Sequence, residues 1–259
     1  MRGDILVVAE CCRHGGSAIV ALCLVWVSAS AGAWPEPIGG QLTIETTEYF
    51  ESEQQDSGFQ QFISRTYFIR GISEHLSFGT VVAYANQFSY GPTFSSSQSG
   101  LSEAELFAQA YLKRQGNHAT AFNLTGAFST SQDIADSRAM GNDAALQFSA
   151  LRGWGNEQFF LEALLGYRRS LGSDRDQLRA NLTLGLKEGD AMILLQSYST
   201  ESVMDGSERG ADFDLTQIGL SAVLPVREGL KIAFGGRRDL SVRGLEPGQA
   251  LFLSLWWRR

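Results

Sequence analysis

The feature of this sequence that most constrains its fold is a repeated alternation of apolar residues with small or polar ones. In the segment 76–90, Leu76, Phe78 and Val82 share one face of an extended chain, whereas Ser77 and Gly79 share the other. A period of two residues indicates half-buried strands and does not fit a helix. The same period recurs at 178–187 and 230–235.

The connections between these segments alternate between short and long. Short turns are predicted at 73–75, 114–118, 153–157, 187–190 and 226–229. Longer polar stretches are predicted at 51–57, 91–102, 130–141, 171–176, 199–211 and 238–248. A transmembrane barrel has this organisation, with tight turns on the periplasmic side, longer loops outside and strands of about ten residues.

The pattern predicts an all-β fold, a 12-stranded antiparallel up-and-down transmembrane β-barrel over residues 34–259. A sheet that spans hydrocarbon has to close on itself, because an unpaired backbone amide there costs several kcal/mol. An even number of strands places both chain ends on the periplasmic side. The expected strands lie at about 40–50, 59–72, 76–90, 102–113, 119–129, 142–152, 158–169, 177–187, 191–199, 212–224, 230–237 and 249–257.

Residues 1–33 are predicted to be a cleavable signal peptide. Arg13 precedes an apolar stretch at 17–33 that ends in Ala31-Gly32-Ala33, which is an A-x-A cleavage pattern. A lipid anchor on Cys23 is an alternative, but Leu22 stands before it where a small residue is expected. Cleavage after Ala33 is therefore the favoured reading.

The predicted mature chain contains no cysteine. Cys11, Cys12 and Cys23 all lie within 1–33, which excludes a disulfide framework and a thiolate metal site from the barrel. The formal net charge of −7 argues against a nucleic-acid partner, because such surfaces are normally basic.

Two sets of side chains follow from the strand assignment. Tryptophans at predicted strand ends or turns suit an aromatic girdle at the membrane interface, namely Trp34, Trp154, Trp256 and Trp257. The candidates for the inner wall are polar or charged, namely Glu162, Arg168, Arg179, Asn181, Thr183, Lys187 and Gln147.

Twelve strands enclose a lumen intermediate between the filled eight-stranded barrel and the open sixteen-stranded porin. Mixed charges across it predict a narrow, weakly selective passage, or a plug if the charges pair. Tyr111 and Phe160 are candidates for stacking against a sugar.

The sequence offers little for catalysis. His75 and Ser77 have the His-x-Ser spacing of barrel phospholipases, but they sit at a predicted turn without a partner, and His118 is also at a turn. Asp212 and Asp214 resemble the paired carboxylates of outer-membrane proteases but lack the His-Asp pair those need. We therefore predict no enzyme activity, no cofactor and no metal site.

The predicted long loops contain several acidic residues. These residues favour solubility of the loops, or loose binding of divalent cations that bridge lipopolysaccharide molecules. They are Asp133, Asp136, Asp143, Asp174, Asp176, Asp205 and Glu208.

Two segments carry a resemblance to known families. The segment 250–257, Ala-Leu-Phe-Leu-Ser-Leu-Trp-Trp, resembles the closing strand of bacterial outer-membrane proteins that the barrel-assembly machinery reads, although Arg258 and Arg259 follow the aromatic. The segment 33–39, Ala-Trp-Pro-Glu-Pro-Ile-Gly, resembles the start of small barrels of the XagA type, which are associated with a secreted adhesive polysaccharide. This resemblance implies a role in exporting an exopolysaccharide or coupling it to the cell surface.

The expectation from the sequence is thus a channel, or an export or support component, for a secreted polysaccharide or small polar solutes. The expected location is the bacterial outer membrane, with contacts to its lipid and lipopolysaccharide, to the barrel-assembly machinery and to polysaccharide synthesis or export proteins. The alternatives are a non-conducting structural or surface-adhesion barrel, a lipid-modifying outer-membrane enzyme, and a periplasmic sugar-binding sandwich.

Overall fold

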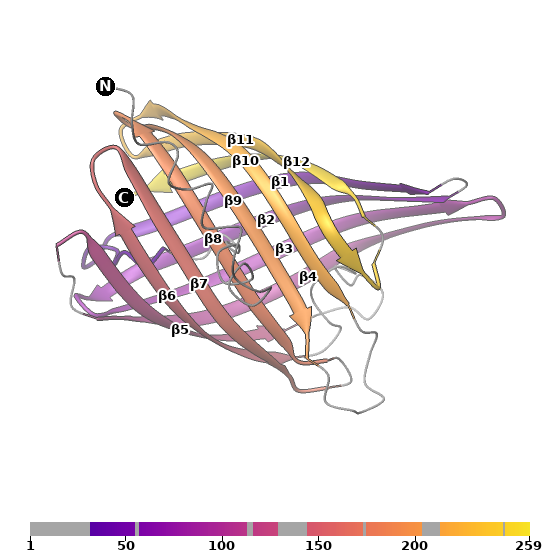
Figure 1. Cartoon of the computed structure of the whole chain (residues 1–259), viewed down its shortest axis with the longest axis horizontal. Helices are drawn as coiled ribbons and strands as arrows, with labels where there is room; N and C mark the ends of the chain where they lie inside the picture. Colours follow the sequence, from indigo (N-terminus) through magenta and orange to yellow (C-terminus); the bar gives the residue numbers. More distant parts are fainter. Residues whose placement is uncertain are drawn as a thin grey trace, which may run out of the picture.

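The twelve predicted strands form a closed barrel. The computed structural model describes residues 32–54, 57–112, 116–128, 144–172, 175–203, 213–245 and 247–259. Consecutive strands pair antiparallel, and β1 pairs with β12 to close the sheet (Figure 1). This confirms the predicted fold class. The strands are β1 (Gln41–Gln54), β2 (Ser57–Ser73), β3 (Leu76–Gly91), β4 (Phe94–Tyr111), β5 (His118–Phe128), β6 (Ala145–Gly155), β7 (Phe159–Ser170), β8 (Gln177–Glu188), β9 (Ala191–Ser202), β10 (Asp214–Arg227), β11 (Leu230–Arg243) and β12 (Gln249–Arg258).

The seam between the first and last strands is continuous. Register pairs run from Leu42 opposite Arg258 to Glu51 opposite Gln249. Beyond them, the backbone of Arg259 exchanges two hydrogen bonds of 2.9 Å with that of Gln41. The two arginines that follow the terminal aromatic therefore belong to the closing ladder. Within the described residues, no helix is long and apolar enough to cross a membrane.

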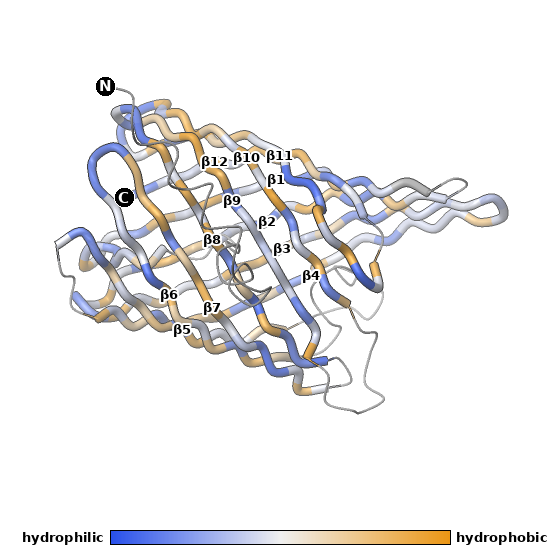
Figure 2. The backbone as a smooth tube through the Cα atoms, in the orientation of Figure 1, coloured by the Kyte–Doolittle hydropathy of each residue, from blue (hydrophilic) through white to orange (hydrophobic). Residues whose placement is uncertain are grey.

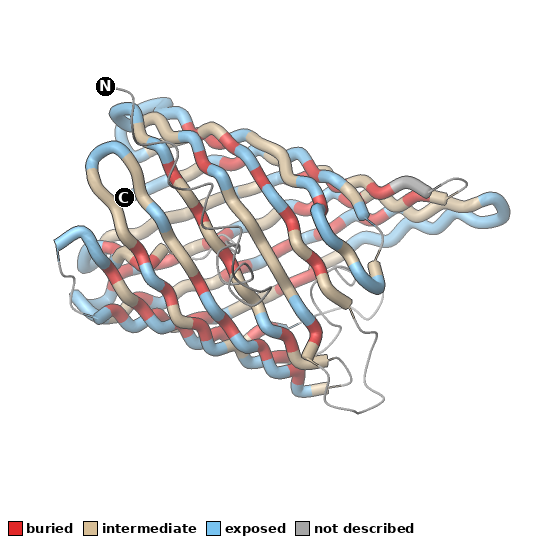
Figure 3. The backbone as a smooth tube through the Cα atoms, in the orientation of Figure 1, coloured by how far each residue is buried: buried red, intermediate tan, exposed pale blue. Residues whose placement is uncertain are grey.

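Each strand turns one row of side chains outward and the other inward. In β8, Leu178 and Leu186 are 42% and 55% exposed, whereas Asn181 and Thr183 are buried. Buried and exposed positions alternate along the strands in Figure 3, and apolar segments recur along them in Figure 2. Because an exposed leucine is stable against acyl chains and unfavourable in water, this arrangement suits a barrel surrounded by lipid.

The strands extend beyond the predicted boundaries at the end that carries the β3–β4 hairpin. The stretch 91–102 was expected to be a loop, but β4 begins at Phe94 and pairs with β3 back to Gly91 opposite Phe94. This hairpin projects past the rest of the barrel (Figure 1). The β4 arm of this hairpin is rich in serine and has no alternation of apolar and polar residues. Strands pair through backbone hydrogen bonds, so this arm can form a strand without that alternation.

The connections at the opposite end are tight. Gly189 and Gly229 have positive φ angles of 59° and 70° in the β8–β9 and β10–β11 turns, a backbone region that favours glycine. The predicted long connections at 130–141 and 199–211 lie mainly outside the described residues, as does the predicted leader apart from Gly32 and Ala33. The leader and its cleavage remain predictions.

Outward placement of the apolar row makes a charge there costly. Leu165 on β7 is 61% exposed. Replacing it with arginine should lower the free energy of unfolding of the vesicle-inserted protein by about 2–4 kcal/mol, which means a less stable barrel. Urea titration of vesicle-folded protein measures this change. The matched control is Gln196→Arg on the inner wall of β9, for which we expect a smaller loss. Equal losses for the two variants would contradict the assignment of the faces.

Candidate functional site

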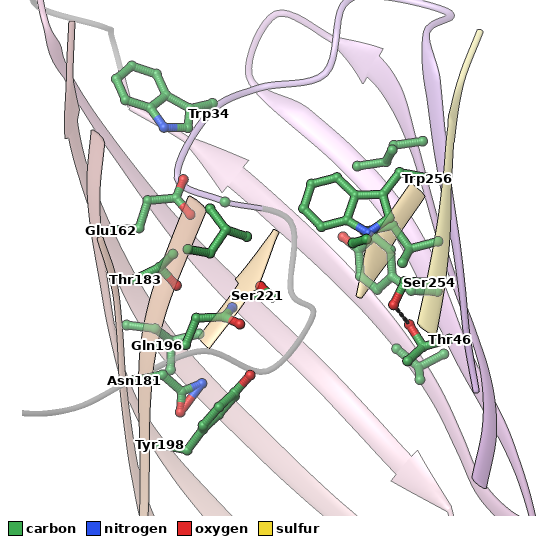
Figure 4. Close-up of a pocket in the computed structure, with 18 of the residues that line it drawn as sticks. Trp34, Thr46, Glu162, Asn181, Thr183, Gln196, Tyr198, Ser221, Ser254 and Trp256 are labelled. Carbon is green, nitrogen blue, oxygen red and sulfur yellow. Dashed lines mark hydrogen bonds between the residues drawn. The ribbon is translucent and has the colours of Figure 1, made fainter. Parts of the chain in front are cut away.

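A large cavity lies inside the barrel, bounded by described residues. Its volume is about 1200 Å³, and inward side chains from all twelve strands line it. Figure 4 shows part of this lining, with Thr46 and Ser254 on one wall and Asn181, Thr183 and Tyr198 on another. The hydroxyl groups of Thr46 and Ser254 are 2.7 Å apart and hydrogen-bonded. The cavity is the candidate site because it is the described space where polar groups converge.

The structure places the candidate inner-wall residues on the inside of β6, β7 and β8. Even-numbered residues of β7 and odd-numbered residues of β6 and β8 point inward, because side chains alternate along a strand. Arg168 is 5% exposed and also points inward. The other six line the cavity directly: Gln147, Glu162, Arg179, Asn181, Thr183 and Lys187.

Three ion pairs form a belt inside the barrel, which we call the ion-pair belt. Arg65 Nη2 lies 3.3 Å from Glu103 Oε2, and Arg168 Nη1 lies 3.4 Å from Glu105 Oε1. Arg237 Nη2 lies 2.5 Å from an oxygen of Glu48. Glu103, Arg168 and Glu48 have side chains that are 6%, 6% and 9% exposed. The belt therefore lies in a partly dehydrated part of the lumen, where charges interact more strongly than in water.

Each pair of the belt joins strands that are not neighbours. Arg65 and Glu103 join β2 to β4, and Arg237 and Glu48 join β11 to β1. Arg168 and Glu105 join β7 to β4, which are three positions apart in the barrel order. These contacts extend across sectors of the lumen. The belt therefore narrows the lumen and also places charged side chains on its wall.

Polar side chains continue the belt around the wall. Arg179 donates to Gln147 Oε1 at 3.2 Å and to Gln177 Oε1 at 2.8 Å. The guanidinium of Arg237 lies 6.0 Å from the centre of the Tyr198 ring. The belt with Arg179 thus combines four arginines (65, 168, 179, 237) with three glutamates (48, 103, 105), which is almost balanced in charge.

A short segment before β1, Trp34–Gly40, enters the barrel at the end where the chain terminates. We call it the entry segment. Glu36 accepts a 2.9 Å ion-pair contact from Arg258. Backbone hydrogen bonds join Gly39 and Gly40 to Gly71 at 2.9 and 3.0 Å. Gly71 suits this close approach, because a Cβ there would lie 2.2 Å from the Pro37 carbonyl oxygen.

The structure corrects the predicted aromatic girdle at two positions. Trp34 packs over Gly153 inside the barrel and lines the cavity, because the entry segment folds inward before β1 begins. Trp256 also lines the cavity (Figure 4). Adjacent residues of a strand face opposite sides, so Trp256 and Trp257 cannot both reach the lipid.

The other two tryptophans point outward. Trp257 is 44% exposed, and the Arg259 guanidinium lies 4.0 Å from its ring centre. Trp154 packs edge-on against Phe159 with ring centres 4.8 Å apart. Both lie close to the turn end of the barrel, where an interfacial aromatic would sit.

The two candidate sugar-stacking aromatics differ in their access to the cavity. Phe160 lines it, with the Lys187 Nζ atom 5.2 Å from the ring centre. Tyr111 points inward but is 4% exposed and packs in an apolar cluster with Leu151 and Leu164. Phe160 is the better placed of the two to meet a solute.

The residues considered for catalysis do not come together. His75 is exposed in the β2–β3 turn, Ser77 is fully buried, and His118 is exposed at the start of β5. Among the described residues, no cluster of three or more His, Cys, Asp or Glu side chains is arranged to hold a metal ion.

The acidic candidates have structural partners where the structure describes them. Asp214 pairs with Arg243 at 2.7 Å. Asp176 accepts a 3.0 Å hydrogen bond from the Ser170 amide and another from the Tyr167 hydroxyl. Asp212 and the remaining acidic loop residues lie outside the described residues, namely Asp133, Asp136, Asp143, Asp174, Asp205 and Glu208.

Most of the ion-pair belt is absent from the sequence-based candidates. Arg168 is the one member that the strand assignment identified. The others occupy inward positions of β1, β2, β4 and β11: Glu48, Arg65, Glu103, Glu105 and Arg237. Alternation with outward apolar neighbours identifies the two members on β4, where Glu103 and Glu105 flank Ala104 and Leu106 follows. Arg65, between Ser64 and Thr66, and Arg237, between Gly236 and Arg238, carry no such signal.

No family model matches this chain, and no curated protein matches its sequence. Solved structures do share its fold. An outer membrane channel from Pseudomonas putida F1 aligns with a TM-score of 0.69 at 13% identity, covering 90% of this chain and 100% of the other. A NanC porin aligns with a TM-score of 0.57 at 7% identity, over 83% and 98% of the two chains. The translocator domain of the autotransporter NalP from Neisseria meningitidis aligns with a TM-score of 0.52 at 12% identity, over 86% and 89%. At these identities the likeness establishes the fold.

The ion-pair belt should set the charge preference of any current through the lumen. Arg168→Gln should move the reversal potential under a salt gradient toward cation preference, and Glu105→Gln should move it toward anion preference, because each leaves its partner's charge uncompensated. Planar-bilayer recording measures both shifts. Arg169→Gln is the matched control, since Arg169 is the exposed outward neighbour of Arg168. Shifts of the same sign for the two belt variants would contradict this assignment.

Proposed function

We propose that this protein is an outer-membrane channel for small polar solutes. The observation that carries the proposal is the cavity of about 1200 Å³, whose lining comes from every strand of the barrel. A lining of carboxylates, guanidinium groups, amides and hydroxyls can replace part of the hydration shell of a passing solute. The fold likeness to a channel and a porin supports the proposal.

The outer-membrane location is part of this proposal. The outward row of large apolar side chains supports it, with Leu165, Leu220 and Leu251 exposed by 61%, 59% and 68%. Contacts with membrane lipid and lipopolysaccharide, and assembly by the barrel-assembly machinery, follow from that location. Proteins of polysaccharide synthesis or export are partners only if the solute is a glycan.

The near balance of charge in the ion-pair belt favours a weakly selective passage. Paired charges attract neither cations nor anions strongly, whereas a wall of one sign would concentrate ions of the opposite sign. We therefore propose uncharged or zwitterionic polar solutes as the preferred class, moving through a narrow route beside the belt.

An oligosaccharide derived from a secreted polysaccharide is the more specific candidate solute. Trp256, Phe160 and Tyr198 line the cavity together with the amides of Asn181 and Gln196. Aromatic faces beside amide groups can contact both the apolar and the hydroxyl surfaces of a sugar. This composition supports the glycan role that the start of the predicted mature chain suggests.

Conductance in planar bilayers tests the channel proposal directly. The chain beginning at Trp34, folded and inserted, should give discrete current steps that neutral oligosaccharides reduce by occupying the lumen. A folded barrel that produces neither current nor liposome swelling with small sugars would contradict the proposal. That result would favour the non-conducting structural alternative, in which the ion-pair belt seals the lumen.

The entry segment should limit this current, because it occupies part of the lumen at the end with the chain termini. Removing residues 34–38 should raise the single-channel conductance. Glu36→Gln should also raise it, to a smaller extent, by weakening the ion pair with Arg258. Glu74→Gln, in the exposed β2–β3 turn at the same end, is the control and should leave the conductance unchanged. Unchanged conductance after the deletion would show that the segment lies outside the route.

A further inference from the structure

The outward face of β1 and β2 carries a group of polar side chains in the middle of the apolar surface. Glu45 and Thr47 on β1 and Ser64 and Thr66 on β2 are all exposed, and we call them the outer polar patch. They point outward because Ile44, Thr46 and Glu48 of β1 and Arg65 and Tyr67 of β2 line the cavity. In the register of the two strands, Glu45 is opposite Thr66 and Thr47 is opposite Ser64.

Apolar side chains surround the outer polar patch on both flanks. On the β12 side, Leu255 is opposite Glu45 and Leu253 is opposite Thr47. On the β3 side, Val82 is opposite Thr66 and Tyr84 is opposite Ser64. These four apolar residues are 43%, 50%, 40% and 46% exposed, so they belong to the outward apolar row.

Aromatic residues close the patch along the strands. Toward the β1–β2 connection, Tyr49 and Phe62 pack with ring centres 4.9 Å apart. Toward the chain ends, Phe68 and Trp257 flank Thr43. The patch therefore lies within the apolar band and not at its polar border.

Some polar groups on the outer face have partners within the chain, unlike the patch. Thr80 donates to the Glu105 carbonyl at 2.7 Å, and the hydroxyls of Ser199 and Thr216 are 3.2 Å apart. Among the described residues, no hydrogen bond or ion pair reaches the side chains of the outer polar patch. A carboxylate facing lipid without a partner is costly, and such residues in membrane proteins mark contacts or functional sites.

We propose that the outer polar patch is the contact surface of a homodimer in the membrane, and that the second copy binds through the same patch. A two-fold axis along the membrane normal, passing through the patch, places the patch of each copy against the patch of the other. Because the strands of a membrane barrel are tilted, the facing strands cross, and each Glu45 carboxylate lies among the hydroxyl groups of the second copy's patch. The hydroxyl groups donate hydrogen bonds that satisfy the carboxylate.

The flanks of the patch fit the same symmetry. Leu253, Leu255, Val82 and Tyr84 of both copies then surround the contact. The interface has a polar centre, in which the three hydroxyl side chains are small enough to permit close approach, and an apolar rim that excludes lipid headgroups and water. The patch is thus self-complementary in hydrogen bonding and in apolar contact, which is why the second copy is the occupant proposed. The proposal depends on membrane insertion and is independent of whether the lumen conducts.

The first test is the mass of the protein in mild detergent and in lipid nanodiscs. We expect a dimer, and we expect Glu45→Leu to raise its dissociation constant by about tenfold or more, because two carboxylate hydrogen-bond sites are lost per dimer. Ser199→Leu is the matched control, since Ser199 is on the outer face but is bonded within its own chain. A monomeric wild-type protein, or a Glu45→Leu variant that dimerises as well as the wild type, would overturn the proposal.

Cross-linking in intact membranes gives a second readout that does not depend on detergent. The predicted mature chain has no cysteine, so Ser64→Cys introduces a single thiol. A short bis-maleimide linker should join two Ser64→Cys chains into a product of twice the monomer mass. Leu165→Cys on β7, six positions from β1 in the barrel order, should give none. Equal products from both variants, or a Ser64→Cys product joined to a protein of another mass, would reject the dimer and point to random collision or to a different partner.

Discussion

The structure depends on the requirement that no backbone amide be left without a hydrogen-bond partner in hydrocarbon. A flat sheet of twelve strands would expose two edges, and each unpaired group on them would cost several kcal/mol in lipid. Closure of β1 on β12 removes both edges, and the last residues of the chain, Arg258 and Arg259, complete that ladder. Once the sheet is closed, the period of two separates a lipid-facing row from a lumen-facing row on every strand. The position of the polar groups then follows from that separation.

The same separation gives the lumen its chemical character. Three glutamates on β1 and β4 and three arginines on β2, β7 and β11 point inward and lie close enough to form ion pairs. The resulting ion-pair belt narrows the lumen and leaves it with little net charge. The entry segment restricts the end near the chain termini. A channel with these two restrictions should be small and weakly selective, which fits passage of polar solutes better than passage of folded protein.

The alternation predicted the twelve strands and the inward side of β7 and β8 because each apolar row is specified locally along one strand. The alternation did not predict features that depend on contacts between distant parts of the chain. The first part of β4, which begins at Phe94, projects past the apolar band and has no apolar row. Its pairing with β3 therefore left no hydropathy signal in the sequence. Trp34 precedes the first strand, and its inward position depends on contacts with Gly153 and on Gly71, which are distant in the sequence. Arg168 pairs with Glu105, which is 63 residues away in the sequence. This pairing depends on the relative positions of β4 and β7 along the barrel axis, which no local pattern specifies.

Cysteine scanning of β8 tests the central claim most directly, because the predicted mature chain has no cysteine of its own. Single cysteines are placed from Leu178 to Lys187 in membrane-inserted protein and labelled with a water-soluble maleimide. Odd-numbered positions should react through the lumen, and even-numbered positions should react only after detergent removes the lipid. Uniform labelling along β8, or labelling that is strongest at the even positions, would contradict a lipid-facing outer row and an aqueous interior.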